Sequence, residues 1–408
     1  MLDAGASVQD FYERYPYPPP VDDLHGYRSV WNDRQRRRHE HHLLWPATPF
    51  RDDHSILVAG CGTSQAAKYA MRWPNARVTG IDFSVTSVRC TEALKHAHGL
   101  ENLQVRRLPI ERVAELETRF DLIVCTGVLH HLADPVAGLR ALRGVLAVDG
   151  AMLLMVYAPY GRAGIYLIQE FCRRVGISAT QDGIRDLVAA LAALPRGHPL
   201  ERLLREAPDF RDEAAIADAL LHPRDRAYSV PQLFDLVESG GLTFRRWVRQ
   251  APYSARCGAV ARVPQSARIA RLSPVEEFTA VELFRGTMVR HSLIATPNDS
   301  PDRARCITFQ GDACLSYVPV RASDTVTVEA RLPPGAVAVL INRAHSSTDI
   351  NLPLDEQEKR WFDAIDDERT IGEMAEPRDT RLRPFFERLW WHDQVVFDAS
   401  RPRHIART

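Results

Sequence analysis

The sequence has no C-x-x-C pair among its seven cysteines, which are scattered along 408 residues. This pattern argues against a zinc ribbon, a dithiol redox motif and a disulfide framework, and it predicts reduced thiols. No apolar run approaches the roughly 18 residues that span a bilayer, and the first residues lack a basic segment followed by an apolar one. We therefore expect a cytoplasmic protein without a membrane segment or a secretory signal.

An excess of either charge is also absent. Lys plus Arg and Asp plus Glu each number 52, so the formal net charge is zero. This balance excludes a broadly basic surface for non-specific nucleic-acid binding. The shares of hydrophobic residues (45%) and charged residues (25%) are typical of a globular protein, and the length predicts two or three domains.

Residues 1–50 are expected to form a separate arm. Its segment from Phe11 to Pro20 is rich in tyrosine and proline, and we expect it to be extended because proline fixes the backbone and removes a donor. Residues 34–44 are predicted to form a polar helix with a solvated face. This helix contains three histidines but no carboxylate or cysteine at ligand spacing, so no metal site is predicted.

Between residues 55 and 157, short apolar runs alternate with helical patterns. This alternation predicts an α/β fold whose parallel sheet carries helices on both faces. The expected strands are 55–60, 77–82, 102–107, 120–125 and 151–157, and the expected helices are 64–73, 84–98 and 135–148.

Residues 160–222 interrupt the alternation with helical patterns at 165–175, 182–194 and 213–221. A helix at 229–240 and strands at 242–249 and 288–295 then follow. The simplest interpretation is a helical insertion into one domain that covers residues 51–299.

A run of Pro, Asn, Asp and Ser at 297–302 predicts a linker. Beyond it, strand patterns at 325–330 and 336–342 and helical patterns at 356–365 and 384–391 predict a small α+β domain over 300–408. The segment from Phe362 to Met374 resembles the winged-helix peptide-carrier proteins of peptide cofactor synthesis. That resemblance implies a peptide or protein partner.

The most informative segment is Gly60-Cys61-Gly62-Thr63-Ser64, between the first strand and the next helix. Glycines let the backbone approach a ligand, and a helix N-terminus favours an anionic group. Asp82 ends the second strand and is placed to accept both hydroxyls of a ribose. Gln65 stands where a dinucleotide-binding loop has its third glycine, which disfavours NAD.

Four segments in order resemble the class I S-adenosylmethionine-dependent methyltransferases: Ile56 to Thr63, Gly80 to Asp82, Phe120 to Leu132 and Leu146 to Gly150. The resemblance implies a Rossmann-like sheet of seven strands with S-adenosylmethionine as cofactor. It places the methionine portion at Gly60, Cys61 and Gly62, the ribose on Asp82 and the adenine on Phe83. It further places Leu108 and Pro109 beside the adenine, and Thr126 and Gly127 opposite the sulfonium.

The arm segment Tyr12-Glu13-Arg14-Tyr15-Pro16-Tyr17-Pro18 is similar to the Y-E-x-x-P-Y-P arm of a bacterial methyltransferase group, as is Arg226 to Leu233. Some members of that group are protein-lysine methyltransferases. We expect Tyr12 and Tyr17 to cover the cofactor, with a tyrosine hydroxyl on the methionine carboxylate. The alternative is that the arm is only a packing strap.

Candidate catalytic residues follow the fourth and fifth strands. His130 and His131 lie at the edge where ligands bind in parallel sheets, and a histidine there can take a proton. The alternative is that this pair only shapes the loop. Tyr157, Tyr160 and Arg162 are candidates for lining the acceptor pocket, and residues 222–228 are a candidate substrate lid.

These residues predict an enzyme that transfers a methyl group to an acceptor that the sequence does not name. The arm, the insertion and the C-terminal segment favour a protein or peptide side chain over a small metabolite. A non-catalytic S-adenosylmethionine-binding regulator is the alternative, because Val58 stands where the family usually has an acidic residue. A nucleic-acid acceptor is disfavoured, because Thr126-Gly127-Val128-Leu129 replaces the Asn-Pro-Pro-Tyr type of motif.

Overall fold

The computed structural model describes residues 4–206, 212–300, 306–374 and 379–401. The chain divides into two compact units. Unit 1 contains Met1–Ser29, Asp53–Thr243 and Arg285–Pro297, and unit 2 contains Val30–Asp52, Phe244–Phe284 and Asn298–Thr408. This division by compactness differs from the predicted domain boundaries near residues 50 and 300, which stay a prediction.

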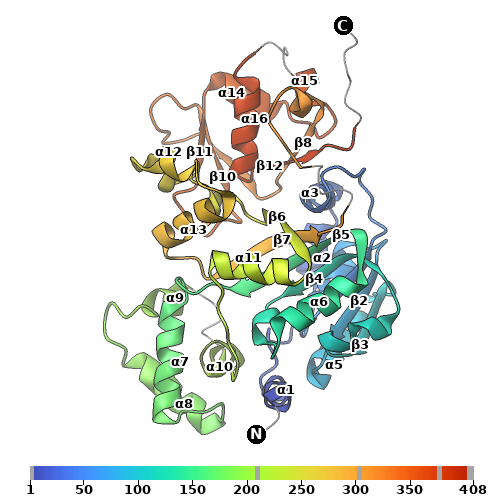
Figure 1. Cartoon of the computed structure of the whole chain (residues 1–408), viewed down its shortest axis with the longest axis vertical. Helices are drawn as coiled ribbons and strands as arrows, with labels where there is room; N and C mark the ends of the chain where they lie inside the picture. The colour runs from blue at the N-terminus through green and yellow to red at the C-terminus, as the bar shows by residue number, and fades with distance from the viewer. Residues whose placement is uncertain (1–3, 207–211, 301–305, 375–378, 402–408) are drawn as a thin grey trace. The chain divides into compact units, whose positions relative to one another are not determined.

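A seven-stranded sheet has the order β3-β2-β1-β4-β5-β7-β6 (Figure 1). The pairs from β3 to β5 are parallel, and β7 runs antiparallel to β5, from Met152 opposite Ala295 to Tyr157 opposite Arg290. The predicted Rossmann-like class is confirmed. The bounds are β1 Ser55–Ala59, β2 Arg77–Asp82, β3 Leu103–Arg107, β4 Phe120–Thr126, β5 Leu146–Tyr157, β6 Leu242–Trp247 and β7 Arg290–Pro297.

The central strands form because both of their faces are covered. All five residues of β1 are buried, as expected for a parallel strand between two helical layers. The helices between the strands are α4 Gln65–Arg72, α5 Val85–His98 and α6 Pro135–Val145. Ser84 caps α5 by accepting from the N–H of Ser87, and Gly99 ends it in the left-handed conformation at φ 60°.

The start of β5 was predicted incorrectly. The sequence pattern extends the preceding helix to Val148, whereas α6 ends at Val145 and β5 begins at Leu146. Leu146 pairs with Phe120 across an irregularity in the β4–β5 register. This tertiary pairing overrides the local helical pattern of residues 146–148.

The helical insertion is confirmed and contains one helix more than predicted. It comprises α7 Ala163–Val175, α8 Gln181–Ala192, α9 Glu201–Glu206 and α10 Glu213–Leu221, and α11 Val230–Ser239 follows it. Its own apolar cluster includes Ile165, Ile168, Leu187, Leu200 and Leu220. The insertion is therefore a packed body and not a loop.

The beginning of the arm is helical, which corrects the expectation of an extended segment from Phe11. Helix α1 covers Ala4–Arg14, and Phe11 packs against Ile184 and Ala217 of the insertion. The first proline is Pro16, so every donor that α1 needs is present, and the helix ends before the residue that precedes proline. A second short helix, α2, covers His25–Trp31.

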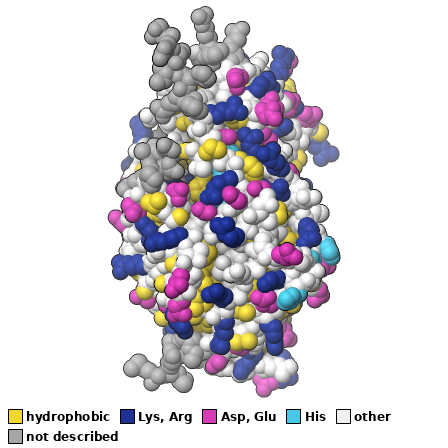
Figure 2. Space-filling view, turned by 90° about the vertical axis from the view of Figure 1, so that its right-hand side faces the viewer, with side chains coloured by type: hydrophobic (Ala, Val, Ile, Leu, Met, Phe, Trp, Pro, Cys, Tyr) yellow, Lys and Arg dark blue, Asp and Glu magenta, His cyan; other side chains and the backbone are white. Residues whose placement is uncertain are grey.

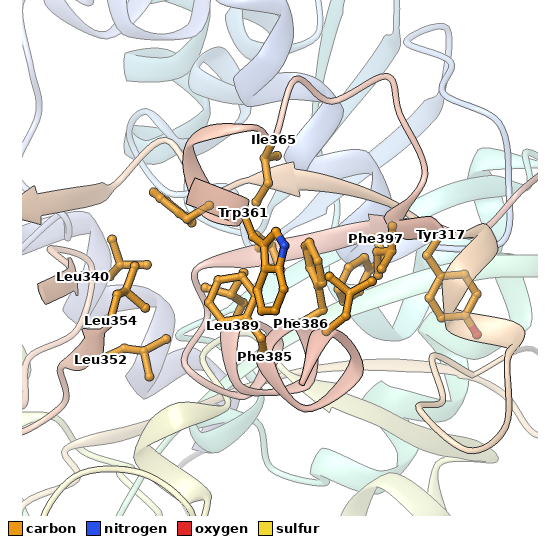
Figure 3. Close-up of a cluster of buried hydrophobic side chains, with 14 of the residues drawn as sticks. Tyr317, Leu340, Leu352, Leu354, Trp361, Ile365, Phe385, Phe386, Leu389 and Phe397 are labelled. Atoms are coloured by element: carbon orange, nitrogen blue, oxygen red, sulfur yellow. The ribbon is translucent and has the colours of Figure 1, made fainter. Parts of the chain in front are cut away.

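Unit 2 is an α+β body with two small antiparallel sheets, β11-β10-β9 and β12-β8. Its apolar cluster gathers Trp361, Phe385, Phe386, Leu389 and Phe397 (Figure 3). The element bounds are α3 Arg34–Leu44, α12 Ser266–Ile269, α13 Pro274–Arg285, β8 Val318–Arg321, β9 Thr325–Val328, β10 Ala338–Asn342, β11 Leu352–Leu354, α14 Glu356–Asp363, α15 Ile371–Met374, α16 Leu382–Trp391 and β12 Val395–Asp398. The resemblance to winged-helix carriers stays a prediction.

Helix α3 exists as predicted but does not present a solvated histidine face. His41 and His42 are buried, and His42 lies 3.5 Å from a carboxylate oxygen of Asp398. Burial lowers the pKa of His42 to about 4. The two rings are packed inside unit 2, a tertiary position that the polar composition of the helix does not indicate.

Two surface properties follow the composition. On the face that Figure 2 shows, Lys and Arg side chains are interspersed with Asp and Glu, in keeping with the balanced charge. Within the described residues, none of the helices has both the length and the apolar character needed to cross a bilayer.

Candidate functional site

A cavity of about 1200 Å³ opens in unit 1 at the carboxyl ends of the parallel strands, the edge where ligands bind in open α/β sheets. Every residue predicted to bind the cofactor lines it: Tyr12, Tyr17, Gly60, Cys61, Gly62, Asp82, Phe83, Leu108, Pro109, Thr126 and Gly127. Two of the three predicted catalytic residues, His131 and Tyr157, line it as well, whereas His130 does not. The fold therefore gathers the predicted residues around one space.

The glycine loop has a backbone that requires glycine. Gly60 and Gly62 lie at φ +71° and +54°, and a Cβ on Gly60 would come within 2.4 Å of Val128 Cγ2. The N–H groups of Gly60 and Cys61 both donate to the Ile81 carbonyl at 2.9 Å, which ties the loop to β2. The loop is thus a preformed wall with its backbone exposed to the cavity.

Asp82 is held in place at the end of β2. One of its carboxylate oxygens accepts from the Gly62 N–H at 2.9 Å and the other from the Ser84 N–H at 2.9 Å. Burial raises the pKa of Asp82, while these main-chain hydrogen bonds act in the opposite direction. Each oxygen keeps a further lone pair, so the oriented carboxylate can still accept from two neighbouring hydroxyls.

Gln65 ties the first helix to the fourth strand. Its amide donates to Thr126 Oγ1 at 2.6 Å, which joins the beginning of α4 to the end of β4. In the sequence, Gln65 is notable only because it stands where a dinucleotide-binding loop has a glycine. Gln65 and Thr126 are 61 residues apart in the sequence, so no local sequence pattern indicates this hydrogen bond.

Hydrogen bonds at two points hold the arm against the carboxyl ends of the parallel strands. Thr63 donates its hydroxyl to the Pro18 carbonyl at 2.7 Å, and a Cβ on Gly62 would lie 3.2 Å from Pro18 Cδ. The Glu13 carboxylate accepts from the Val85 N–H at the first turn of α5. The arm contacts the glycine loop and the helix after Asp82, the two elements that form the predicted cofactor wall.

The cavity is also lined by aromatic and ionisable side chains. Tyr12 donates its hydroxyl to Asp218 Oδ1 at 3.0 Å, and burial raises the pKa of both groups. The rings of His131 and His222 lie with centroids 3.9 Å apart. His131 Nδ1 lies 2.6 Å from the Arg224 carbonyl oxygen. The insertion thus contributes directly to the region next to the histidine pair.

His130 occupies a different position from His131. It is fully buried, its ring lies 4.0 Å from that of Tyr157, and burial lowers its pKa well below the usual value. Neither of its ring nitrogens has a hydrogen-bond partner among the described residues. Of the two adjacent histidines, His131 is therefore the one that faces the cavity.

Arg162 and Tyr160, both predicted near the acceptor, separate in the structure. Arg162 lines the cavity, pairs with Asp225 at 3.2 Å and stacks its guanidinium carbon 3.5 Å from the centre of the Tyr157 ring. Tyr160 is exposed and does not line the cavity. Gln169 also donates to Asp225, at 3.0 Å. The positive charge of Arg162 is thus paired with Asp225.

Two overlapping sets of side chains have the composition of metal ligands: His131, Asp218 and His222, and His130, His131 and Asp225, with ligand atoms within 4.8 Å of one another in each set. The sequence patterns do not indicate Asp218, and they indicate Asp225 only as part of the candidate lid at 222–228. One signal was available, because Asp218 and His222 are four residues apart at the end of a predicted helix and so share a face.

Comparison with known proteins gives the following likenesses. Residues 57–152 match a family model described as a methyltransferase domain. An uncharacterised protein of Synechococcus sp. is 33% identical over 247 residues, which is 58% of this chain and 58% of that protein. A tRNA U34 carboxymethyltransferase of Campylobacter curvus is 27% identical over 103 residues, 25% of this chain and 34% of that protein. The chain therefore spans less than two thirds of either relative.

Among solved structures, PKMT2 from Rickettsia typhi matches with a TM-score of 0.61 and 16% identity, covering 92% of this chain and 75% of that one. The same protein in complex with AdoHcy matches with a TM-score of 0.60, 15% identity and coverage of 94% and 77%. At this identity the likeness concerns the fold. Residues 57–152, which match the methyltransferase-domain model, belong to the Rossmann-like sheet, in agreement with the predicted cofactor.

Proposed function

We propose that unit 1 transfers a methyl group from S-adenosylmethionine to an acceptor, and that the acceptor is a protein or peptide side chain. One observation carries the proposal. A single cavity is lined both by the glycine loop and Asp82 and by His131, Tyr157 and Asp218. A group-transfer enzyme needs such a space, because donor and acceptor must meet within it.

The cofactor end fits the shape and polarity of S-adenosylmethionine. Gly60 and Gly62 line the cavity with positive φ and without side chains, and Asp82 supplies an oriented carboxylate for the ribose. Phe83, Leu108 and Pro109 supply the apolar surface for the adenine, while Thr126 and Gly127 stand beside the reacting centre. These assignments extend the sequence prediction to a cavity that all of these residues line.

The bound cofactor supplies an electrophilic methyl group, so the chain's own residues mainly position the acceptor and exclude water. The arm covers the cofactor end through Thr63 and Pro18, and α10 covers the acceptor end through Asp218. His131 faces the cavity as the group able to take a proton. Tyr157 holds its ring against His130 and Arg162 and forms part of the acceptor wall.

A protein that binds S-adenosylmethionine without transferring its methyl group is the second candidate. One observation favours it. Val58 is fully buried and apolar at the position where the resemblance leads us to expect an acid. A small-metabolite methyltransferase would share the cofactor end and differ only in its acceptor.

The proposal is tested by calorimetric titration of the full chain with S-adenosylmethionine and S-adenosylhomocysteine, followed by incubation with methyl-labelled S-adenosylmethionine in a cell lysate. Binding together with label in protein that resists nuclease supports the proposal. Label only in small molecules, or only in nuclease-sensitive material, overturns the choice of acceptor. Binding without any transfer favours the regulator, and failure to bind either ligand overturns the proposal itself.

A further inference from the structure

The main chain of Arg224 hydrogen-bonds to two histidine rings, as an acceptor to one and as a donor to the other. Its carbonyl oxygen lies 2.6 Å from His131 Nδ1, and its N–H donates to His222 Nδ1 at 3.0 Å. A carbonyl oxygen can only accept, so His131 Nδ1 carries a hydrogen and the lone pair of the neutral ring lies on Nε2. A main-chain N–H can only donate, so Nδ1 of His222 is bare and its hydrogen lies on Nε2.

The two rings therefore differ in their ability to take a proton. His222 can accept one only at Nδ1, which is already engaged by the Arg224 N–H. Burial, together with the nearby His131, lowers the pKa of His222 to about 2. Nε2 of His222 is buried and has no hydrogen-bond partner within the described part of the chain. His131 is left as the ring whose lone pair is free for chemistry.

Asp218 completes the group. A ring nitrogen of each of the two histidines and a carboxylate oxygen of Asp218 lie within 4.8 Å of one another. Asp218 is buried, and the hydrogen bond from Tyr12 engages only Oδ1. A carboxylate in this position stabilises a positive charge on the neighbouring imidazole more strongly than it would in water.

We infer that Asp218, His222 and the main chain of Arg224 form, with His131, a subsite for a protic methyl acceptor, an amine or a hydroxyl that carries hydrogen on its nucleophilic atom. The inference rests on the proposed function and deepens it. The N–H or O–H bond of the acceptor breaks, its electron pair stays on the acceptor atom, and the proton bonds to His131 Nε2. Asp218 then faces the imidazolium that results.

In this arrangement Asp218, His222 and Arg224 are positioning residues, and His131 is the catalytic residue. Arg224 fixes the tautomers, and His222 packs on the His131 ring. The titratable and charged groups around His131 are Tyr12 on α1, the adjacent His130, Tyr157 on β5, Arg162, Asp218 on α10, and His222, Arg224 and Asp225 in the following loop. Binding of a metal ion by the same side chains would be an alternative to proton transfer by His131.

The first test reads the tautomers directly and needs no acceptor. The full chain is labelled with ¹⁵N-histidine, and long-range proton–nitrogen spectra are recorded with and without S-adenosylhomocysteine. His131→Gln and His222→Gln identify the two spin systems. We expect hydrogen on Nδ1 of His131 and on Nε2 of His222. The same tautomer in both rings, or rapid exchange between tautomers in His131, overturns the inference.

The second test compares Asp218→Asn with Asp186→Asn, a matched substitution at an exposed position of α8 in the same insertion. Asn keeps the shape of Asp218 and an oxygen that accepts from Tyr12 but loses the charge. We expect methyl incorporation from labelled S-adenosylmethionine in lysate to fall 10- to 100-fold for Asp218→Asn. The acid side of its rate–pH profile should move to lower pH, while Asp186→Asn matches the unmodified chain. Equal rates and equal pH profiles overturn the inference.

Binding measurements separate this inference from the proposed function. S-adenosylhomocysteine affinity should agree within twofold between the unmodified chain and Asp218→Asn. If the unmodified chain does not bind S-adenosylhomocysteine, the proposed function is overturned. The tautomers of His131 and His222 would still be established by the first test. Stoichiometric Zn²⁺ binding that Asp218→Asn abolishes would identify a metal site and would overturn the protic subsite.

Discussion

The Glu13 carboxylate receives both hydrogen-bond donors of Thr86, the main-chain N–H at 3.0 Å and the hydroxyl at 2.6 Å. A residue of the arm thus caps the first turn of α5, 73 positions further along the chain. Anionic groups at a helix N-terminus satisfy free donors and complement the helix dipole. The contact makes the arm part of the structure of the cofactor edge.

Glu13→Ala should loosen the arm. The change removes a helix cap, which typically contributes about 0.5–2 kcal/mol, so α1 and the first turn of α5 should exchange their amide hydrogens faster. Hydrogen exchange measured by mass spectrometry reports both segments. Exchange rates equal to those of the unmodified chain would show that Glu13 does not fasten the arm.

Acid should also loosen the arm, because protonation of Glu13 weakens the same contacts with α5. Burial raises the pKa of Glu13, but hydrogen bonds from Thr86 and Val85 outweigh that effect and lower it. A lowered pKa in the folded state stabilises the fold above the ordinary pKa of a carboxyl, and this stabilisation is lost as the pH falls through the folded value. Exchange in α1 should therefore accelerate as the pH falls below the ordinary pKa of a glutamate carboxyl. In Glu13→Gln the acceleration should be absent.

Asp82→Ala should weaken S-adenosylhomocysteine binding at least tenfold. The substitution removes the acceptor proposed for the ribose, and charge-assisted hydrogen bonds contribute about 1.5–3 kcal/mol. It also frees the Gly62 N–H that Asp82 now holds. Calorimetry gives the dissociation constant, with Asp186→Ala as the matched control at an exposed position of α8. An unchanged constant would remove Asp82 from the site.

Gly60→Ala should cost more stability than Gly99→Ala, although both glycines have positive φ. At Gly99 nothing lies within 4 Å of the added Cβ, so only the left-handed strain of roughly 1–2 kcal/mol applies. At Gly60 the added Cβ collides with Val128, and overpacking adds about 1–3 kcal/mol.

Denaturant unfolding measures both variants and the double variant Gly60→Ala/Val128→Ala. Shortening Val128 removes the collision, so the double variant should recover part of the stability that Gly60→Ala loses. Equal costs for Gly60→Ala and Gly99→Ala would contradict the close packing of the glycine loop.

Phe386→Ala should destabilise unit 2 by about 3–5 kcal/mol, because Phe386 is fully buried in the aromatic cluster of Figure 3. Phe284→Ala is the control, since its side chain on α13 is 52% exposed and exposed substitutions change stability by less than about 0.5 kcal/mol. Hydrogen-exchange protection of α14 and α16 reports the difference. Similar protection in both variants would place Phe386 outside the core.

The elements that the sequence predicts correctly are those whose signals are local. The apolar run of β1 and the Ser84 and Gly99 caps of α5 lie within their own segments, and each was located to within one or two residues. The missing parts depend on distant partners. Strand β8 pairs with β12, more than 70 residues away, and neither short segment alternates strongly enough to indicate a strand.

The residues of the candidate site also fall into those with local sequence signals and those that distant contacts put in place. Apart from Tyr12 and Tyr17 of the arm, the predicted cofactor residues follow consecutive strands in motifs with fixed spacing, and all of the predicted residues line the cavity. Asp218 comes from the insertion and Asp225 from the loop that follows it. The insertion packs against Phe11, and this tertiary contact brings Asp218 near the histidines. Tyr12 lies on a helix where the tyrosine–proline composition suggested an extended chain, yet it reaches the predicted cavity.

The two fastenings of the arm set a time scale for the site. Pro18 accepts from Thr63 beside the glycine loop, and Glu13 accepts from the start of α5. We therefore expect a molecule seated on Asp82 to leave only after both contacts open. The residence time of spent cofactor is then governed by the opening rate of the arm. Turnover would show a burst of product in the first cycle, followed by a slower rate that rises when Glu13 is removed.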